Sequence, residues 1–168
     1  MSVLVTGASG MLGRALIKAL SLDGKVLGVS RSGAGGGLAC DLTDPQQVKK
    51  LFKLDFFNLV IHTAAYSDVD GCERNPKLAH TSNALSTKYL AQACAKKRTP
   101  FIYISTDYVF DGAKKALVQE NDTPCPINIY GMTKLEGEYH TKQWAPVSAI
   151  VRTSWLFGPG NPSNFVNA

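Results

Sequence analysis

VLVTGASGMLG, at residues 3–13, is the stretch that decides the fold class of this 168-residue chain. It begins with a short apolar run that is typical of a buried strand, and glycines follow at positions 7, 10 and 13. Apolar residues then recur at helical spacing as Leu12, Leu16, Ile17 and Leu20. A strand that turns through glycines into a helix is the opening unit of a parallel α/β sheet.

The spacing of these glycines, G-x-x-G-x-x-G after a threonine, suits a turn that binds phosphate. Gly7 and Gly10 place no Cβ between the backbone and a ligand and permit the φ angles of a tight turn. The following helix offers unpaired N–H groups and the positive end of its dipole, and Gly13 lets that helix pack closely on the sheet. We therefore expect the turn to hold the pyrophosphate of a dinucleotide. The expected contacts are Gly7, Ser9, Gly10, Met11, Leu12 and Gly13.

Apolar runs rich in β-branched and aromatic residues alternate with helical stretches along the rest of the chain. The expected strands are residues 3–6, 25–30, 38–41, 59–62, 101–105 and 148–152. Beyond the first helix, we expect one that starts at Pro45 with Asp44 as its N-cap, and others over residues 76–97 and 130–142. The sequence thus predicts a Rossmann-type, doubly wound α/β sheet with helices on both faces, in one NAD(P)-binding domain over residues 1–168.

Composition limits the class of protein. Hydrophobic residues make up 45% of the chain and charged residues 18%, as in a globular protein with a real core. No window approaches the roughly 18 consecutive apolar residues of a membrane span, and the first residues lack a signal-peptide pattern. We expect a cytoplasmic protein without membrane contact. Its four cysteines lack metal-ligand and disulfide spacings and should be reduced.

The charged residues indicate neither nucleic acid nor metal. The net charge is +5, but the dense basic run from Lys96 to Arg98 falls where a helix should end, and cations are favourable there. The three histidines are scattered, so we expect them to be structural or exposed. Asp68, Asp70 and Glu73 fit a solvated loop better than a magnesium site. We expect no metal and no nucleic-acid partner.

The end of the second expected strand indicates which dinucleotide binds. An acidic residue there binds the ribose 2′-hydroxyl, whereas arginine accommodates the 2′-phosphate of NADPH. This chain has Ser30-Arg31-Ser32 at that place. We therefore expect NADPH, with NADH as the alternative, Arg31 as the clamp for the phosphate, and Ser30 or Ser32 as its hydrogen-bonding neighbour.

Tyr130 and Lys134 lie four residues apart on an expected helix and therefore share one face. A free tyrosine has a pKa of about 10, and a neighbouring ammonium lowers it by favouring the phenolate. Tyr130 would then act as a general acid toward a carbonyl oxygen. Thr106 ends the apolar run that begins at Phe101, and ligands bind beyond the carboxyl ends of parallel strands. Thr106 is thus the expected partner of the carbonyl.

Together these features resemble the extended short-chain dehydrogenase/reductases. The shared elements are the glycine turn, the Asp41-Leu42 pair, the segment Ala64-Ala65 and the Y-x-x-x-K helix. Three further segments, STDYVFDG, YGMTKLEGE and RTSWLFG, begin at positions 105, 130 and 152 and are similar to the dTDP-4-dehydrorhamnose reductases. The resemblance covers essentially the whole chain.

This resemblance implies NADPH-dependent reduction of the C4 keto group of a dTDP-4-dehydro-6-deoxy sugar, in dTDP-rhamnose synthesis. Tyr130 would donate the proton, Thr106 would orient the oxygen, and Lys134 would hold the nicotinamide ribose and lower the pKa of Tyr130. The implied partner is a nucleotide-sugar substrate. The other implied cofactor contacts are Asp41 and Leu42 at the adenine, and Ala64, Ala65 and Tyr66 beside the cofactor backbone.

Members of this family are much longer, and their later part supplies most of the nucleotide-sugar pocket. We therefore expect a C-terminal substrate domain to lie outside this chain. An unpaired sheet edge can self-associate, so the sequence is compatible with a homodimer.

Two alternatives stay open. One is a non-catalytic NADP-binding regulatory module with a protein partner, because the β regulatory subunit of methionine adenosyltransferase has a similar S-D-Y-V-F-D-G stretch. Thr106, where that subunit has serine, and the segment from Arg152 to Trp155 favour the reductase. The other is a nucleotide-sugar epimerase or dehydratase. Dehydratases place an Asp-Glu pair after the corresponding threonine, whereas here Tyr108 follows Asp107.

Overall fold

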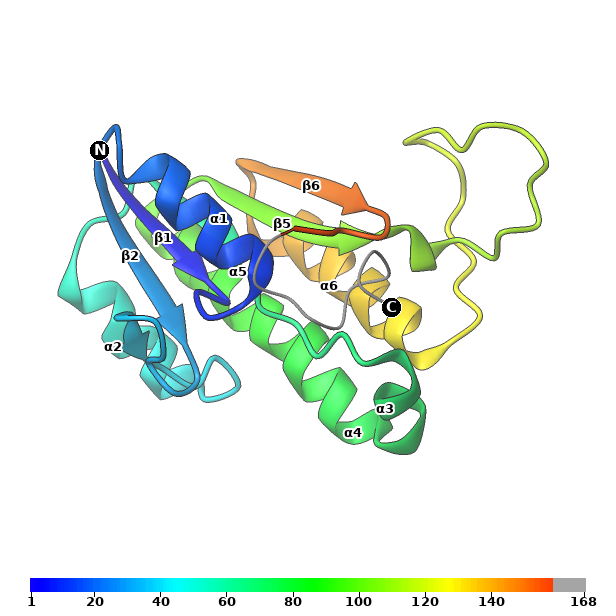
Figure 1. Cartoon of the computed structure of the whole chain (residues 1–168), viewed down its shortest axis with the longest axis horizontal. Coiled ribbons are helices and arrows are strands. Elements are labelled where there is room, and N and C mark those ends of the chain that lie inside the picture. Colours follow the sequence, from blue (N-terminus) through cyan, green and yellow to red (C-terminus); the bar gives the residue numbers. More distant parts are fainter. Residues whose placement is uncertain (159–168) are drawn as a thin grey trace.

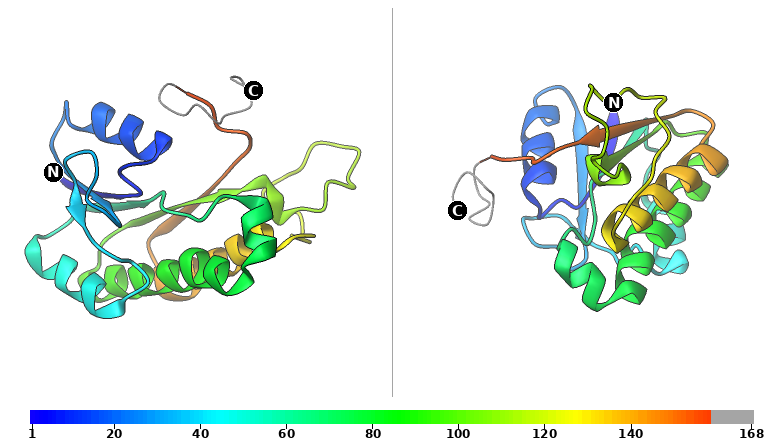
Figure 2. Two further views of the ribbon diagram at one scale, coloured as in Figure 1. Left: turned by 60° about the horizontal axis from the view of Figure 1, so that its bottom comes forward. Right: turned by 90° about the vertical axis from the view of Figure 1, so that its right-hand side faces the viewer.

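The computed structural model describes residues 1–158, in which six strands form one sheet with helices on both faces (Figure 1, Figure 2). The strand order is β3-β2-β1-β4-β5-β6, and every neighbouring pair is parallel. In a doubly wound sheet of this order, ligands bind where the order reverses, here between β1 and β4. The Rossmann-type fold expected from the sequence is confirmed.

The elements follow the expected alternation of strand and helix. The strands are β1 Ser2–Thr6, β2 Lys25–Ser30, β3 Leu38–Ala39, β4 Leu59–His62, β5 Phe101–Thr106 and β6 Ser148–Thr153. The helices are α1 Met11–Leu20, α2 Pro45–Leu54, α3 Val69–Arg74, α4 Pro76–Ala79, α5 Ser86–Lys97 and α6 Ile129–Trp144. A π-helical segment, η1 His80–Leu85, joins α4 to α5, and a 3-10 turn, η2 Asp107–Val109, follows β5.

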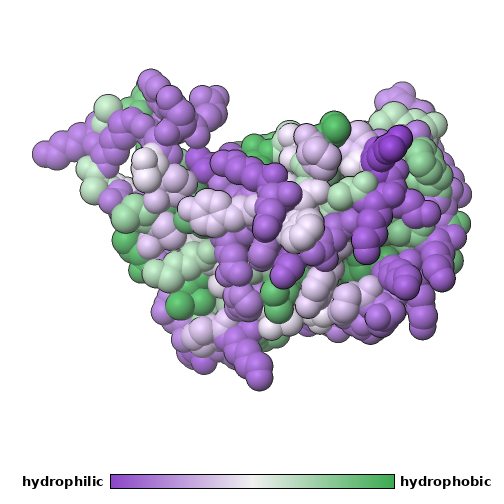
Figure 3. All heavy atoms as spheres, turned by 180° about the vertical axis from the view of Figure 1, so that it is seen from behind, coloured by the Kyte–Doolittle hydropathy of each residue, from purple (hydrophilic) through white to green (hydrophobic). Residues whose placement is uncertain are grey.

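Two apolar layers hold the sheet between its helices. On one face Val3 and Val5 pack with Ile17 of α1, whereas on the other Leu4 packs in a cluster that includes Leu90 of α5. This alternation along β1 is the period of a strand buried on both sides. Helices α2, α5 and α6 cover the second face, and their outer surface is mostly hydrophilic (Figure 3). None of the helices in residues 1–158 has the length and apolar character that a membrane crossing requires.

The third strand is shorter than expected and ends at Ala39 instead of Asp41. The Asp41 amide donates to Gln47 Oε1, 2.9 Å away, and the Asp41 carboxylate accepts from the amide and hydroxyl of Thr43. These bonds turn the chain toward α2 and so remove Asp41 from the strand ladder.

The single helix expected over residues 76–97 is interrupted. The predicted first and last residues are confirmed, but residues 80–85 form a π-helical segment. The hydroxyls of Thr81, Ser86 and Thr87 bond to carbonyls four residues earlier, and such bonds distort helices. Single π segments of this kind occur often at functional sites.

The acidic stretch after β4 is a helix and not the expected solvated loop. Asp68 is the N-cap of α3 and accepts from the Gly71 amide at 2.9 Å, and Asp70 lies in the first turn. Negative side chains are favourable at a helix N-terminus. Glu73 then accepts from the Ile129 amide at 2.7 Å and so ties α3 to the start of α6.

Candidate active site

The glycine turn forms a backbone cradle at the carboxyl end of β1. Gly7 has φ +70°, and a Cβ there would lie 2.7 Å from the Ala64 amide nitrogen. A Cβ at Gly13 would overlap the Gly7 carbonyl oxygen, so only glycine lets α1 start this close to the turn. Gly10 is the N-cap of α1 with φ −76°, so, unlike Gly7, it has no unusual φ angle, contrary to expectation. No side chain in residues 1–158 caps α1, so the first amides of the helix are available to a ligand at the turn.

A cleft of about 280 Å³, which we call the nucleotide cleft, lies beside this turn. It is lined by residues that the sequence predicted, namely Gly7, Ser9, Gly10, Ser30, Arg31, Asp41, Leu42, Ala64, Ala65 and Tyr66. Ser82 of η1 and Ser86 of α5 also line it and were not predicted. Ser30 Oγ and Ser82 Oγ are buried there without a hydrogen-bond partner in the described part of the chain.

A second cleft of about 390 Å³, the catalytic cleft, shares Gly7, Gly10 and Ala65 with the first. Its walls include the remaining predicted residues, Met11, Leu12, Gly13, Thr106, Tyr130 and Lys134. The predicted site residues therefore line one of two adjoining clefts at the carboxyl ends of the strands, except Ser32, the alternative to Ser30, which lines neither.

Tyr130 lies in the first turn of α6, where Asn128 caps the helix by accepting from the Gly131 amide at 2.7 Å. A Cβ at Gly131 would overlap the Tyr108 carbonyl oxygen, so glycine lets this turn pack directly on η2. The rings of Tyr130 and Tyr108 meet edge to face, with centroids 5.7 Å apart. Burial raises the pKa of Tyr130 to about 12, against a hydrogen bond with Thr106 that lowers it. The hydroxyl therefore holds its proton at neutral pH.

Lys134 differs from expectation in what it contacts. Its Nζ donates to the Ile104 carbonyl at 2.7 Å and lies 4.2 Å from the centre of the Tyr103 ring. The pKa of Tyr130 is raised, with burial as the largest cause, so the expected lowering of that pKa is wrong for this structure. The side chain is 3% exposed, and burial lowers its own pKa to about 7, against an opposing effect of Glu138.

A family model described as the RmlD substrate binding domain matches residues 1–168. The chain belongs to this family. A crystal structure of a dTDP-4-dehydrorhamnose reductase from Clostridium acetobutylicum is 41% identical, with a TM-score of 0.91 over 99% of this chain and 57% of that one. The enzyme of the same name from Bacillus anthracis, solved in complex with NADP, is 36% identical, with a TM-score of 0.90 over 98% of this chain and 57% of that one.

A curated relative, the probable low-salt glycan biosynthesis reductase Agl14 of Haloferax volcanii, is 38% identical over 99% of this chain and 57% of its own length. The chain thus spans little more than half the length of these relatives. The resemblance to the dTDP-4-dehydrorhamnose reductases that the sequence motifs indicate is confirmed.

This member of the RmlD substrate binding domain family contains a clamp that the sequence did not reveal. Asn83, in the π-helical segment, is 1% exposed; its Oδ1 accepts from the Tyr66 amide at 2.7 Å. Its Nδ2 donates to the Tyr66 carbonyl and to Thr133 Oγ1, both at 3.1 Å. Asn83 therefore joins the loop after β4 to α6, next to Lys134. A lone asparagine inside an expected helix gave no signal of this.

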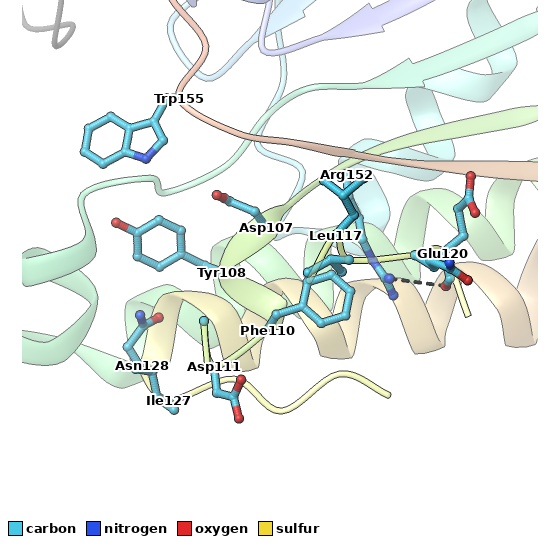
Figure 4. Close-up of a pocket in the computed structure, with 13 residues that line it drawn as sticks. Asp107, Tyr108, Phe110, Asp111, Leu117, Glu120, Ile127, Asn128, Arg152 and Trp155 are labelled. Carbon is cyan, nitrogen blue, oxygen red and sulfur yellow. Dashed lines mark hydrogen bonds between the residues drawn. The ribbon is translucent and has the colours of Figure 1, made fainter. Parts of the chain in front are cut away.

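A third cavity, of about 770 Å³, extends outward from the catalytic cleft and shares Asp107, Tyr108 and Trp155 with it. We call it the side pocket. Tyr108 and Trp155 lie toward one end of it, and Arg152 lies toward the other (Figure 4). Phe110 adds an apolar wall, and Arg152 stands 4.9 Å from the centre of its ring.

His62 is a core residue, as expected. Its two ring nitrogens form hydrogen bonds with Thr6 Oγ1 at 2.7 Å and with Thr87 Oγ1 at 3.1 Å, and the ring is stacked with that of Tyr103. Burial lowers its pKa to about 3, so the ring is neutral at physiological pH.

Proposed function

We propose that this chain forms the NADPH-binding and catalytic part of a reductase that acts on the C4 keto group of a dTDP-4-dehydro-6-deoxy sugar. The observation that carries the proposal is that Thr106, Tyr130 and Lys134 line one cleft with the glycine turn. A dinucleotide bound at the turn could extend along this cleft toward Tyr130 and Lys134, which supports the proposal. The two similar crystal structures are of dTDP-4-dehydrorhamnose reductases, one of them in complex with NADP, and they support the same assignment.

The residues present fit a dinucleotide. The Gly7 cradle would be filled by a Cβ, and the amides at the start of α1 suit a pyrophosphate. The partnerless hydroxyls of Ser30 and Ser82 are the kind of buried polar atoms that a ligand satisfies. Arg31 lines the nucleotide cleft and is exposed, so its guanidinium is available to a 2′-phosphate.

Each side chain of the catalytic cleft then has a separate role in the reduction of the carbonyl. Bound NADPH supplies the hydride. Tyr130 holds a proton on its hydroxyl and donates it to the carbonyl oxygen, and Thr106, which is 5% exposed, orients that oxygen. In its protonated form, Lys134 supplies a buried positive charge beside the proton donor, which suits the ribose hydroxyls and the charge that develops on oxygen. We further propose a cytoplasmic enzyme with a nucleotide-sugar substrate.

Titration of the protein with NADPH and with NADH, followed by nicotinamide fluorescence, tests the cofactor assignment. We expect NADPH to bind at least about tenfold more tightly, because Arg31 adds a charge-assisted contact to the 2′-phosphate. Arg31→Ala should remove this preference and leave the NADH affinity unchanged. Lys18→Ala, which removes an exposed cation from the last turn of α1, is the matched control. Equal affinities for both dinucleotides in the wild type would reject NADPH specificity, and no binding of either would reject the site.

A further inference from the structure

A buried carboxylate, that of Glu138, lies one helical turn beyond Lys134 on α6. Glu138 is 1% exposed and Lys134 is 3% exposed, and no other Lys, Arg, Asp or Glu side chain in residues 1–158 is buried. Residues four apart on a helix share a face. Two opposite charges are thus enclosed together behind the catalytic cleft, and the proposed chemistry uses only the lysine.

The Glu138 carboxylate is held by donors from two strands. Arg152 of β6 donates from Nε to Oε1 at 2.9 Å and from Nη2 to Oε2 at 2.7 Å, which is the two-point geometry of a strong ion pair. Ser105 of β5 donates from Oγ to Oε1 at 2.7 Å. One side chain therefore joins α6 to the ends of β5 and β6.

Those strand ends carry the walls of the catalytic cleft. Ser105 immediately precedes Thr106 and pairs in register with Arg152, and Thr153 Oγ1 donates to the Ser105 carbonyl at 3.1 Å. Lys134 bonds to the carbonyl of Ile104, one residue before Ser105. Lys134 and Glu138 thus attach successive turns of α6 to successive residues of β5, and this double attachment sets the position of Thr106 relative to the helix.

We propose that Glu138 is a positioning residue of the reductase, which fixes α6 against the ends of β5 and β6 and places a carboxylate one helical turn from Lys134. The proposal rests on the function proposed above. Its geometric basis is the three bonds to the carboxylate, its burial, and its place on the same helix face as Lys134.

The charges around Lys134 agree with this role. The titratable groups that face it are Glu138 and Tyr130 on α6, Tyr103 on β5 and His62 on β4. Burial raises the pKa of both tyrosines and lowers that of His62, so all three are neutral near pH 7. Glu138 is then the anionic group that opposes the effect of burial on the pKa of Lys134. Removal of its charge must lower the pH at which Lys134 loses its proton.

Nuclear magnetic resonance of the ligand-free protein, with ¹³C-labelled lysine, reads the Lys134 titration directly. The Lys134 signal is identified by its loss in Lys134→Met. In Glu138→Gln we expect the midpoint to fall by about one pH unit or more, the effect of losing a nearby opposite charge. Glu136→Gln, on the same helix but half-exposed and paired with His80, should leave the midpoint unchanged. An unshifted midpoint in folded Glu138→Gln would overturn the proposal.

A second variant covers the case in which Glu138→Gln does not fold because Arg152 is left unpaired. Glu138→Gln combined with Arg152→Met removes both charges of the pair, an exchange that buried ion pairs often tolerate. The Glu138 carboxylate, which opposes the effect of burial on Lys134, is absent in this variant as well, so the midpoint should still fall. A midpoint equal to that of the wild type in this variant would overturn the proposal.

NADPH affinity measured across the same pH range ties the titration to function. In the wild type, affinity should decline as Lys134 loses its proton, and in the Glu138 variants the decline should begin at lower pH. An unchanged pH profile despite a shifted midpoint would overturn the positioning role. Absence of NADPH binding by the wild type at any pH would instead count against the proposed function, because the lysine midpoint is read without ligand.

Discussion

The nucleotide cleft and the catalytic cleft adjoin each other, but the first is formed mainly by backbone and the second by side chains. The nucleotide cleft rests on a backbone turn around Gly7, and its charged residue Arg31 is exposed to solvent. The catalytic cleft is backed by buried side chains, among them Lys134 and Glu138, which bond across two strands. The first is specified by backbone shape and the second by long-range side-chain contacts. Single substitutions in the two clefts should therefore have different effects on stability and on NADPH binding.

The largest loss of stability should come from the catalytic side. Glu138→Ala leaves Arg152 without its buried partner, and breaking such a pair costs about 3–5 kcal/mol of unfolding free energy. Glu136→Ala on the same helix removes a half-exposed carboxylate and should cost less than about 1 kcal/mol. Urea unfolding measures both. Equal losses for the two variants would show that the buried pair is no more important than a surface one.

On the nucleotide side, Gly7→Ala should be the most damaging change. The left-handed conformation costs a non-glycine residue about 1–2 kcal/mol, and the new Cβ would also press on the Ala64 amide. Gly35→Ala is the matched control, because Gly35 has φ +80° but no heavy atom near its Cβ position. We expect Gly7→Ala to lose more stability than Gly35→Ala and also to lose NADPH binding. The same loss in both variants would mean that strain alone, and not close approach, requires glycine at position 7.

Asn83→Ala tests the link between the two clefts. It leaves the Tyr66 amide unpaired and leaves the Tyr66 carbonyl only the weak Cys72 thiol donor, which should cost about 1–3 kcal/mol. It should also weaken NADPH binding because the loop beside the cofactor loses its clamp. Asn75→Ala removes the N-cap of α4, where Asn75 Oδ1 accepts from the Leu78 amide, and should cost about 1 kcal/mol without changing NADPH affinity. If Asn83→Ala binds NADPH with wild-type affinity, the clamp does not contribute to cofactor binding.

The smallest effect is a pH dependence from the core behind both clefts. The pKa of His62 is about 3 in the folded protein, below its unfolded value of about 6.5, so the unfolded chain binds more protons between these values. Stability therefore falls as pH falls, by about 1 kcal/mol between pH 6 and pH 5 from this residue. His62→Gln removes this contribution and should flatten the profile relative to the wild type. Parallel profiles would contradict a neutral, buried His62.

The sequence was informative where structure is local. The glycine turn, Arg31 at the end of β2, and the four-residue spacing of Tyr130 and Lys134 were all predictable, because each depends on residues close together in the chain. The alternation of strand and helix likewise predicted the doubly wound parallel sheet.

What could not be predicted depends on contacts between distant segments. The Asn83 clamp spans 17 residues to Tyr66 and 50 to Thr133, and the Glu138 bond to Ser105 spans 33. Glu138 did carry one signal, since it follows Tyr130 and Lys134 at the same four-residue spacing. The contact of Lys134 with Ile104 and the burial that raises the pKa of Tyr130 both depend on packing that no local pattern reveals.

A crystal structure of the protein grown with NADPH would test the central claim most directly. The account predicts pyrophosphate density at the Gly7 turn, the 2′-phosphate beside Arg31, and the nicotinamide ring in the catalytic cleft next to Tyr130 and Lys134. NADPH bound with its nicotinamide away from Tyr130, or bound outside these two clefts, would contradict it.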